Sequence, residues 1–224
     1  MTGRVVPLAL NIPGRVVVFD YGEVLSQAPN ESDRAALVAV ADADPEAFWH
    51  AYWEHRDDLD HGVVSIRDYW KRIADDLTLV WSESRIQQLW LADYRSWLSV
   101  NPATFDILAD LDAGETRMAM LSNAGFDFAS PFRFSPMARF FERVFISAEL
   151  GMRKPFQEIY EEVAEELSIT PDEMIFIDNK QENVDGAAAL GIQTHLFVTA
   201  EGLRSFLEGL ATQTPIRSAR AAFR

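Results

Sequence analysis

The sequence of 224 residues predicts an α/β fold, in which a doubly wound parallel sheet carries one long helical insertion. Short apolar runs rich in Val, Ile and Phe are typical of buried parallel strands. Helical patterns separate the later runs, and this alternation indicates a doubly wound sheet. A long helical pattern separates the first run from the second. The predicted strands are residues 16–19, 118–121, 144–146, 174–177 and 194–198.

The insertion after the first strand is rich in aromatic side chains. They fall on neighbouring positions of one helix and on one face of another, as Phe48, Trp49, Tyr52 and Trp53 and then Trp90, Tyr94 and Trp97. Large aromatic side chains are usually buried. We therefore expect them to pack between the helices of the insertion rather than to contact a substrate.

Two helices are predicted in the second half of the chain. Gly114 and Gly191 stand where helices are expected to end, and Thr170 followed by Pro171 is typical of a turn. Apolar residues repeat at helical spacing as Phe156, Ile159, Tyr160, Val163 and Leu167 after Pro155, and as Leu203, Phe206, Leu207 and Leu210 near the C-terminus.

These patterns divide the chain into two units. Residues 1–25 and 100–224 are predicted to form the core, and residues 26–99 a helical cap inserted into it. A chain of 224 residues with 48% hydrophobic content can bury a substantial core, but it is hardly long enough for two full domains. We therefore expect one catalytic domain with a cap.

The charge balance excludes some classes of partner. With 35 acidic and 20 basic residues, the formal net charge is −15, which repels nucleic acids and anionic membranes. A small molecule is the expected partner, and an anionic one would need local positive charge at its site.

The chain has no cysteine, which excludes disulfides and thiolate nucleophiles. The apolar patch at the N-terminus is too short and Pro-interrupted for a signal sequence or membrane span, so a cytoplasmic location is expected.

Polar residues follow the predicted strands. In an open parallel sheet, ligands bind at the carboxyl ends of the strands, so these residues would share one edge. Each has an ordinary structural explanation by itself, as a turn former or a helix cap. Their joint occurrence at successive strand ends favours a site formed by Asp20 after the first strand, Ser122 and Asn123 after the second, Arg153 and Lys154 beyond the third, and Asp178 and Asn179 after the fourth.

The segments FDYGEVL, LSNA, GMRKP and FIDNKQENVDGA resemble, in order and strand context, the four motifs of the haloacid dehalogenase-like superfamily. They are most similar to the branch that contains small sugar-phosphate phosphatases. The resemblance covers nearly the whole chain, including a helical cap between the first two motifs. It implies a Rossmann-like core, bound Mg²⁺ and hydrolysis of a small phosphorylated metabolite.

The resemblance also implies a role for each motif residue. Asp20 would attack phosphorus and form an aspartyl-phosphate that water hydrolyses. Ser122 and the backbone amide of Asn123 would hold phosphate oxygens, and Lys154 would neutralise charge on the phosphate and on Asp20. Oxygen ligands suit Mg²⁺. The implied ligands are Asp20, the backbone carbonyl of Gly22, and Asp178 or Asn179.

The chain departs from the family pattern at Gly22, where most phosphatases of the superfamily carry a second Asp that acts as general acid and base. General acid catalysis is typically worth about 10² to 10⁴ in rate. Slow turnover of alkyl phosphates is therefore expected, with better turnover of aryl, acyl or anomeric sugar phosphates. A replacement acid could come from Glu23 or from the segment EHRDDLDHG, which offers His55, Asp57, Asp60 and His61, although a solvated charged turn is the favoured interpretation of that segment.

A second departure is Asn179, which stands where the family often has a second acid and would be an uncharged metal ligand. Gly22 and Asn179 together leave open a catalytically weakened phosphate-binding or regulatory module. A metal-independent haloacid dehalogenase using Asp20 is a third hypothesis, which sensitivity to EDTA would separate from a phosphatase. The substrate, and whether the protein is a monomer or a homodimer, are left open by the sequence.

Overall fold

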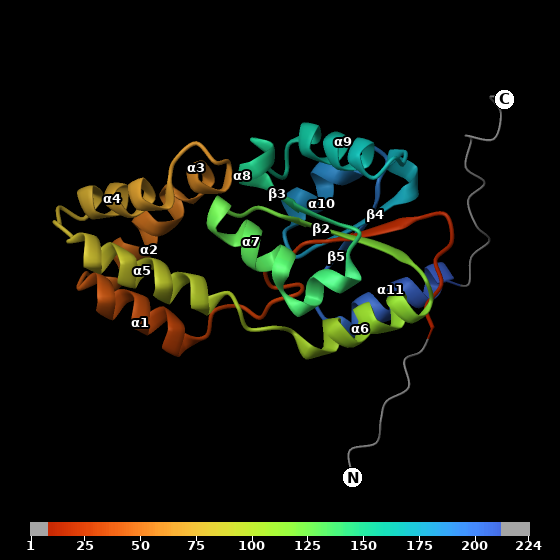
Figure 1. The fold of residues 1–224 in the computed structure, drawn as a ribbon, viewed down its shortest axis with the longest axis horizontal. Coiled ribbons are helices and arrows are strands. Elements are labelled where there is room, and N and C mark those ends of the chain that lie inside the picture. Colours follow the sequence, from red (N-terminus) through yellow and green to blue (C-terminus); the bar gives the residue numbers. More distant parts are fainter. Residues whose placement is uncertain (1–8, 212–224) are drawn as a thin grey trace, which may run out of the picture.

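The computed structural model describes residues 9–211 and contains a five-stranded sheet with the order β3-β2-β1-β4-β5 (Figure 1). Neighbouring strands of the sheet all pair in parallel, which confirms the predicted fold class. Residues 1–8 and 212–224 of the predicted core unit lie outside the described residues. The strands are β1 (Val16–Phe19), β2 (Arg117–Ser122), β3 (Arg143–Ile146), β4 (Met174–Asp178) and β5 (Gln193–Leu196).

The predicted strands agree with the observed ones to within one or two residues. The largest difference is at β5, which ends at Leu196 although the apolar run continues to Val198. Phe197 leaves the strand pairing, but its N–H still donates to the carbonyl of Asp178 at 2.8 Å. Val198 is 76% exposed, so the end of this run is a surface loop rather than a buried strand.

Helices cover both faces of the sheet. Val17 and Phe19 of β1 belong to one buried cluster, and Val16 and Val18 belong to the other, because successive side chains of a strand point to opposite faces. The core therefore has three layers (Figure 1). The first cluster includes α6 (Pro102–Ala113), α7 (Phe126–Phe134) and α11 (Ala200–Ala211), and the second includes α9 (Gln157–Glu166) and α10 (Gln181–Ala188).

Some predicted helix ends differ from the structure. Gly114 is the C-cap of α6, as predicted, but Gly191 is two residues beyond Ala189, the C-cap of α10. Phe156 is the N-cap of α9 and is 53% exposed, so it does not belong to that helix's buried face. Three short elements complete the core, namely η1 (Pro136–Phe140), α8 (Ser147–Leu150) and the turn η2 (Pro171–Glu173).

Five helices follow β1 and form a helical insertion with its own buried aromatic core, which includes Tyr52, Tyr69 and Trp70. Side chains of Asn30, Asp44, Ser65 and Ser82 cap the first turns of four of them. The insertion lies within the predicted residues 26–99, and its role as a cap stays a prediction. Its helices are α1 (Glu31–Ala41), α2 (Pro45–Glu54), α3 (Arg56–Asp60), α4 (Ile66–Asp76) and α5 (Glu83–Ser96).

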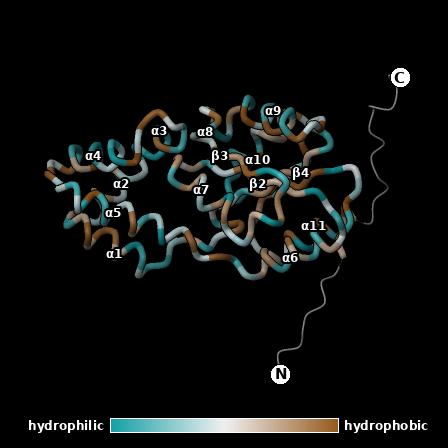
Figure 2. Tube along the Cα trace, viewed as in Figure 1, coloured by the Kyte–Doolittle hydropathy of each residue, from teal (hydrophilic) through white to brown (hydrophobic). Residues whose placement is uncertain are grey.

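The two connections between the core and the helical insertion lie side by side. Ser26 and Val100 form an antiparallel bridge, and the N–H of Gln27 donates to the carbonyl of Ser99 at 2.7 Å. The insertion extends from the carboxyl end of β1 (Figure 1). Hydrophobic and hydrophilic residues alternate along its helices (Figure 2). Within residues 9–211, no helix is both long and apolar enough to cross a membrane.

Candidate active site

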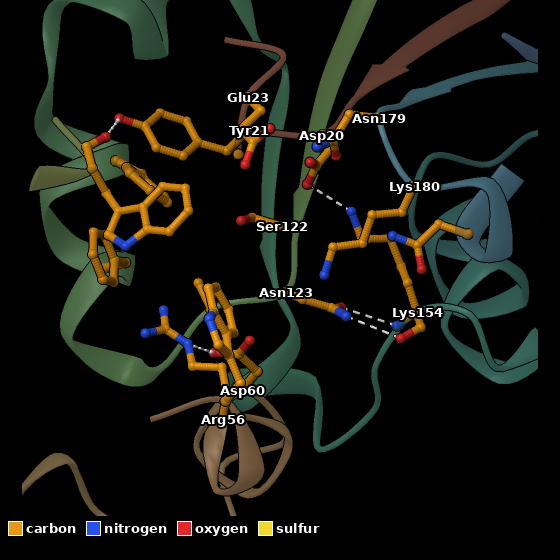
Figure 3. Close-up of a pocket in the computed structure, with 17 residues that line it drawn as sticks. Asp20, Tyr21, Glu23, Arg56, Asp60, Ser122, Asn123, Lys154, Asn179 and Lys180 are labelled. Carbon is orange, nitrogen blue, oxygen red and sulfur yellow. Dashed lines mark hydrogen bonds and ion pairs between the residues drawn. The ribbon is translucent and has the colours of Figure 1, made fainter. Parts of the chain in front are cut away.

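A cavity of about 120 Å³ lies at the carboxyl edge of the sheet, between the core and the helical insertion. Figure 3 shows polar side chains from the core on one side of it and Arg56 and Asp60 of α3 on another. The structure brings six of the predicted site residues to this cavity, namely Asp20, Gly22, Ser122, Asn123, Lys154 and Asn179.

Lys154 lies at the centre of the charged residues, and it is 1% exposed. Its Nζ donates to Asp20 Oδ1 at 2.6 Å, to Asp178 Oδ2 at 2.7 Å and to the carbonyl of Leu121 at 3.1 Å. Burial opposes the charge of the ammonium, but the carboxylates of Asp178 and Asp20 outweigh it and raise the pKa of Lys154. The side chain is therefore a buried cation shared by two carboxylates, so an anionic substrate would need further positive charge, such as a bound metal ion.

Asp20 follows β1 directly, and it is 7% exposed at the cavity. Its N–H donates to the carbonyl of Ile177 at 2.9 Å, and this hydrogen bond holds Asp20 beside the end of β4. Burial raises the pKa of the Asp20 carboxyl to about 6, and the charge of Lys154 acts against this rise. A cation bound at the carboxylate would favour the ionised form, which is the form that can act as a nucleophile.

Asp178 lies behind the cavity rather than on it, and it is fully buried. Its Oδ2 accepts from Lys154 Nζ and from Asn183 Nδ2 at 3.0 Å, and its Oδ1 accepts from the N–H of Lys180 at 2.8 Å. Asn179, the next residue, lines the cavity instead. Of the two metal ligands that the sequence left open, Asn179 is therefore the better placed, while Asp178 holds Lys154 and the start of α10.

The residues at the cavity fit a magnesium ion. Among residues 9–211, no three His, Asp or Glu side chains gather as a metal site. Of the ligands that the resemblance implies, Asp20 offers a carboxylate at the cavity and Gly22 and Asn179 offer uncharged oxygens, a combination that suits Mg²⁺. Asn183, which the sequence did not single out, is 3% exposed, lines the cavity and has a buried Oδ1 without a hydrogen-bond partner. Its position in the first turn of α10, directly after the loop that carries Asn179, was the available indication.

Ser122 and Asn123 connect the end of β2 to the loop that carries Lys154. Ser122 is 4% exposed and lies on the cavity. The side chain of Asn123 binds the backbone of Lys154 twice, because Nδ2 donates to its carbonyl at 2.9 Å and Oδ1 accepts from its N–H at 3.0 Å. This amide therefore holds the backbone of Lys154 beside Ser122.

Asn123→Ala should remove both of these hydrogen bonds. We expect a loss of about 1–3 kcal/mol in the free energy of unfolding, because two partly buried backbone groups lose their partners. Chemical unfolding would measure the loss. Asn11→Ala is a matched control, because Asn11 Nδ2 donates to the carbonyl of Gly114 at 2.7 Å, far from the cavity. Equal turnover in the Asn123 variant and the wild type would contradict a role for Asn123 in placing Lys154.

Aromatic side chains form another wall of the cavity. Phe48 and Tyr52 are buried inside the helical insertion, as expected. Trp53 and Trp97 instead line the cavity, contrary to the expectation, and Trp53 is 51% exposed. Spacing alone could not show which side of α2 faces the core. The remaining rings of this wall are Tyr21, Phe128 and Phe132.

The charged segment after α2 places one of its acids on the cavity. His55 Nε2 contacts Asp76 Oδ2 at 2.7 Å, and Asp57 pairs with Arg153 at 2.7 Å. Asp60 lines the cavity and accepts from Arg56 Nε at 3.0 Å. The favoured prediction for this segment, a solvated charged turn, is therefore correct only in part. Arg153 connects it to the core instead of lining the cavity.

Comparison with known proteins shows what this chain resembles. A family model described as haloacid dehalogenase-like hydrolase matches residues 15–191. D-ribitol-5-phosphate phosphatase of Bacteroides thetaiotaomicron is 22% identical over 187 residues, which cover 80% of this chain and 89% of that protein.

Solved structures show the same fold. A predicted HAD-like family hydrolase from Porphyromonas gingivalis has a TM-score of 0.70 and 25% identity, over 92% of this chain and 100% of that one. A HAD family enzyme from Bacteroides thetaiotaomicron, solved with magnesium and inorganic phosphate, has a TM-score of 0.63 and 22% identity, over 81% of this chain and 92% of that one.

Proposed function

Because the chain belongs to the haloacid dehalogenase-like hydrolases, we propose that it is a magnesium-dependent phosphatase of a small phosphorylated metabolite. The main support is the position of Lys154 Nζ, which binds Asp20 at 2.6 Å and Asp178 at 2.7 Å beside the cavity. Phosphoryl transfer depends on placed charge more than on covalent chemistry from the protein. The phosphatase from Bacteroides and the related structure with magnesium and phosphate agree with this proposal.

The reaction would proceed in two steps at Asp20. In the first, a carboxylate oxygen bonds to phosphorus and the ester P–O bond breaks, which releases the alcohol. In the second, water attacks the same phosphorus, phosphate leaves and the carboxylate is restored. Ser122 and the backbone amide of Asn123 would hold phosphate oxygens, while Lys154 offsets the charge on the phosphoryl group and on Asp20.

The residues that would hold magnesium are Asp20, the carbonyl of Gly22 and Asn179, with Asn183 Oδ1 close behind. The ion would neutralise charge on the phosphoryl oxygens. Asp178 would act on Lys154 rather than on the ion, since its oxygens are already bound by Lys154, Asn183 and Lys180.

The helical insertion would act as the cap that selects the organic part of the substrate. Trp53 of α2 and Trp97 at the end of α5 face the same cavity as Asp20. The cavity is small, about 120 Å³, and the net charge of −15 disfavours nucleic acid. A small phosphate ester is therefore the expected substrate.

Release of phosphate from 4-nitrophenyl phosphate, with Mg²⁺, with EDTA and after Mg²⁺ is restored, tests the proposal. We expect turnover that EDTA suppresses by at least about 100-fold and that added Mg²⁺ restores, because metal stabilisation of the transferring group is worth several kcal/mol. Turnover unchanged by EDTA would contradict the proposal. Halide release from a 2-haloacid, measured in the same buffers, would support a dehalogenase instead.

A further inference from the structure

We propose that Asp60, carried into the cavity by the helical insertion, is the general acid and base that replaces the one missing at Gly22. The inference rests on the proposed phosphatase function. Of the four candidates in the segment EHRDDLDHG, Asp60 lines the cavity, while the others contact residues elsewhere. Those contacts join His55 to Asp76, Asp57 to Arg153 and His61 to the carbonyl of Gly151.

The backbone of Asp60 is fixed to the core beside the predicted phosphate-binding loop. Ser147 Oγ, which is fully buried, donates to the carbonyl of Asp60 and accepts from the N–H of Ala124 at 2.9 Å. Ala124 itself lines the cavity. A single hydroxyl therefore connects the end of α3 to the loop after β2.

The packing beside this contact is close, and at Gly62 it leaves no room for a Cβ atom. A Cβ on Gly62 would lie 2.6 Å from the carbonyl oxygen of Ala148, and this glycine has a φ of +76°. A Cβ on Gly125 would lie 3.3 Å from the side chain of Leu59, the residue before Asp60. The end of α3 therefore packs closely on the core, and this packing helps to place Asp60.

Arg56 orients the carboxyl group of Asp60. Its Nε donates to Asp60 Oδ1 at 3.0 Å, and its Nη1 donates to Tyr52 Oη at 2.8 Å and lies 3.4 Å from Asp93 Oδ2. The side chains of Arg56 and Asp60 are 11% and 13% exposed. A guanidinium held by other partners can keep a carboxyl group in one orientation at the edge of the cavity.

The position of Asp60 suits the geometry of phosphoryl transfer. The attacking and leaving oxygens lie on opposite sides of phosphorus. When Asp20 attacks from the sheet, the leaving oxygen therefore points away from it, toward the helical insertion. Figure 3 shows Asp60 across the cavity from Asp20, with Ser122 and Asn123 between them. This is the side on which a proton donor to the leaving oxygen has to stand.

The surrounding charges make Asp60 a usable acid. Burial raises the pKa of its carboxyl to about 6, against the opposing charges of Arg56 and Lys180, while the charge of Asp57 adds to the rise. Other charged groups near α3 are already paired, as Asp93 with Arg56, Asp58 with Arg72 of α4, and Glu149 of α8 with Arg133. The protonated form that donates to a leaving group is lost as the pH rises through this pKa.

Both proton transfers balance. As the ester P–O bond breaks, the protonated carboxyl of Asp60 gives its proton to the leaving oxygen and becomes a carboxylate. When water attacks the phosphoryl group on Asp20, that carboxylate takes a proton from the water. Asp60 then returns to its protonated form, and Asp20 is free again.

The test compares two esters of similar shape, benzyl phosphate and 4-nitrophenyl phosphate, whose leaving groups need a proton to very different extents. With Asp60→Asn, kcat/KM, which reports the step that releases the alcohol, should fall by about 10² to 10⁴ for benzyl phosphate but by less than about tenfold for 4-nitrophenyl phosphate. The alkaline decline in the wild-type rate on benzyl phosphate should vanish in the variant. The preference for aryl over alkyl phosphates, which the sequence predicts from Gly22, should therefore be found in Asp60→Asn and not in the wild type.

Asp58→Asn is the matched control, because Asp58 is on the same helix, pairs with Arg72 and lies outside the cavity lining. It should leave both rates unchanged. Glu23→Gln tests the other acid on the cavity, which is exposed and lies beside Gly22. A leaving-group effect in Glu23→Gln, and none in Asp60→Asn, would overturn the assignment.

A second variant restores the acid at its usual place. A Cβ on Gly22 would lie 3.8 Å from both Asp20 Oδ2 and Trp97 Cζ3, which is ordinary contact, so a Cβ atom fits at this position. Gly22→Asp should recover at least about tenfold of the benzyl phosphate rate in the Asp60→Asn background, since a positioned acid is worth more than that. Gly22→Asp in the wild-type background should give no comparable gain, because Asp60 already supplies the proton, and an equal gain in both backgrounds would show that Asp60 is not the acid.

Two further outcomes distinguish a wrong role for Asp60 from a wrong proposed function. If the wild type is active and Asp60→Asn raises KM for both esters without changing kcat, Asp60 binds substrate and is not the acid. If the wild type releases phosphate from neither ester in Mg²⁺, the phosphatase function itself fails, and the inference falls with it.

Discussion

Asp20→Asn should abolish phosphatase activity, with a fall in kcat of at least about 10⁴-fold on 4-nitrophenyl phosphate, comparable to the loss of other enzyme nucleophiles. An amide oxygen carries no negative charge and is a poor nucleophile toward phosphorus. The substitution also removes the charge of the proposed magnesium ligand Asp20, and Asp178 does not line the cavity to replace it. Magnesium should therefore bind more weakly to the variant. Steady-state kinetics with saturating Mg²⁺ would measure the loss.

The loss should occur without unfolding, because Asn has nearly the same shape as Asp and Lys154 keeps its bond to Asp178 at 2.7 Å. Asp112→Asn is a suitable control, since Asp112 forms an exposed ion pair with Arg139 on the core surface. Mass spectrometry of rapidly quenched wild type should find phosphate on the peptide that contains Asp20. Retention of more than a tenth of the wild-type rate by Asp20→Asn would exclude a nucleophilic role for this residue.

The sequence was sufficient to predict the sheet and the edge where the site lies. A parallel strand buried on both faces appears as a continuous apolar run, and β1 and β4 end where their runs meet Asp20 and Asp178. Since ligands bind at the carboxyl ends of such strands, chain order alone brings these ends together. The four motifs therefore met at one cavity as expected.

The remaining parts of the site depend on contacts that no local pattern contains. Asp178 and Asn179 are adjacent in sequence, yet Lys154 and Asn183 hold the first behind the cavity and leave the second on it. Trp53 lies on the cavity while Phe48 and Tyr52 of the same helix are buried in the helical insertion, and the docking of α3 on α8 is set by tertiary packing. The same docking places Asp60 at the cavity, although its neighbours form surface ion pairs.

Lys154→Met should be the most destabilising single change at the site. We expect a loss of about 3–5 kcal/mol in the free energy of unfolding near neutral pH, because breaking a buried ion pair leaves its partner uncompensated. Here two carboxylates, those of Asp20 and Asp178, lose a shared counterion. Urea unfolding monitored by tryptophan fluorescence would measure the loss. Lys180→Met is the matched control, since Lys180 is exposed on the next loop and its loss should cost less than about 0.5 kcal/mol.

The deficit of Lys154→Met should depend on pH with a definite sign. Without the ammonium, the folded variant gains by protonating a buried carboxyl, whereas the unfolded chain protonates it only near its ordinary pKa of about 3.9. The folded variant therefore binds more protons than the unfolded chain in mildly acidic solution, and its stability rises as the pH falls. We expect a smaller deficit against the wild type at about pH 5 than at about pH 8. An equal deficit at both would show that lost packing of the lysine stem, rather than two uncompensated carboxylates, destabilises the variant.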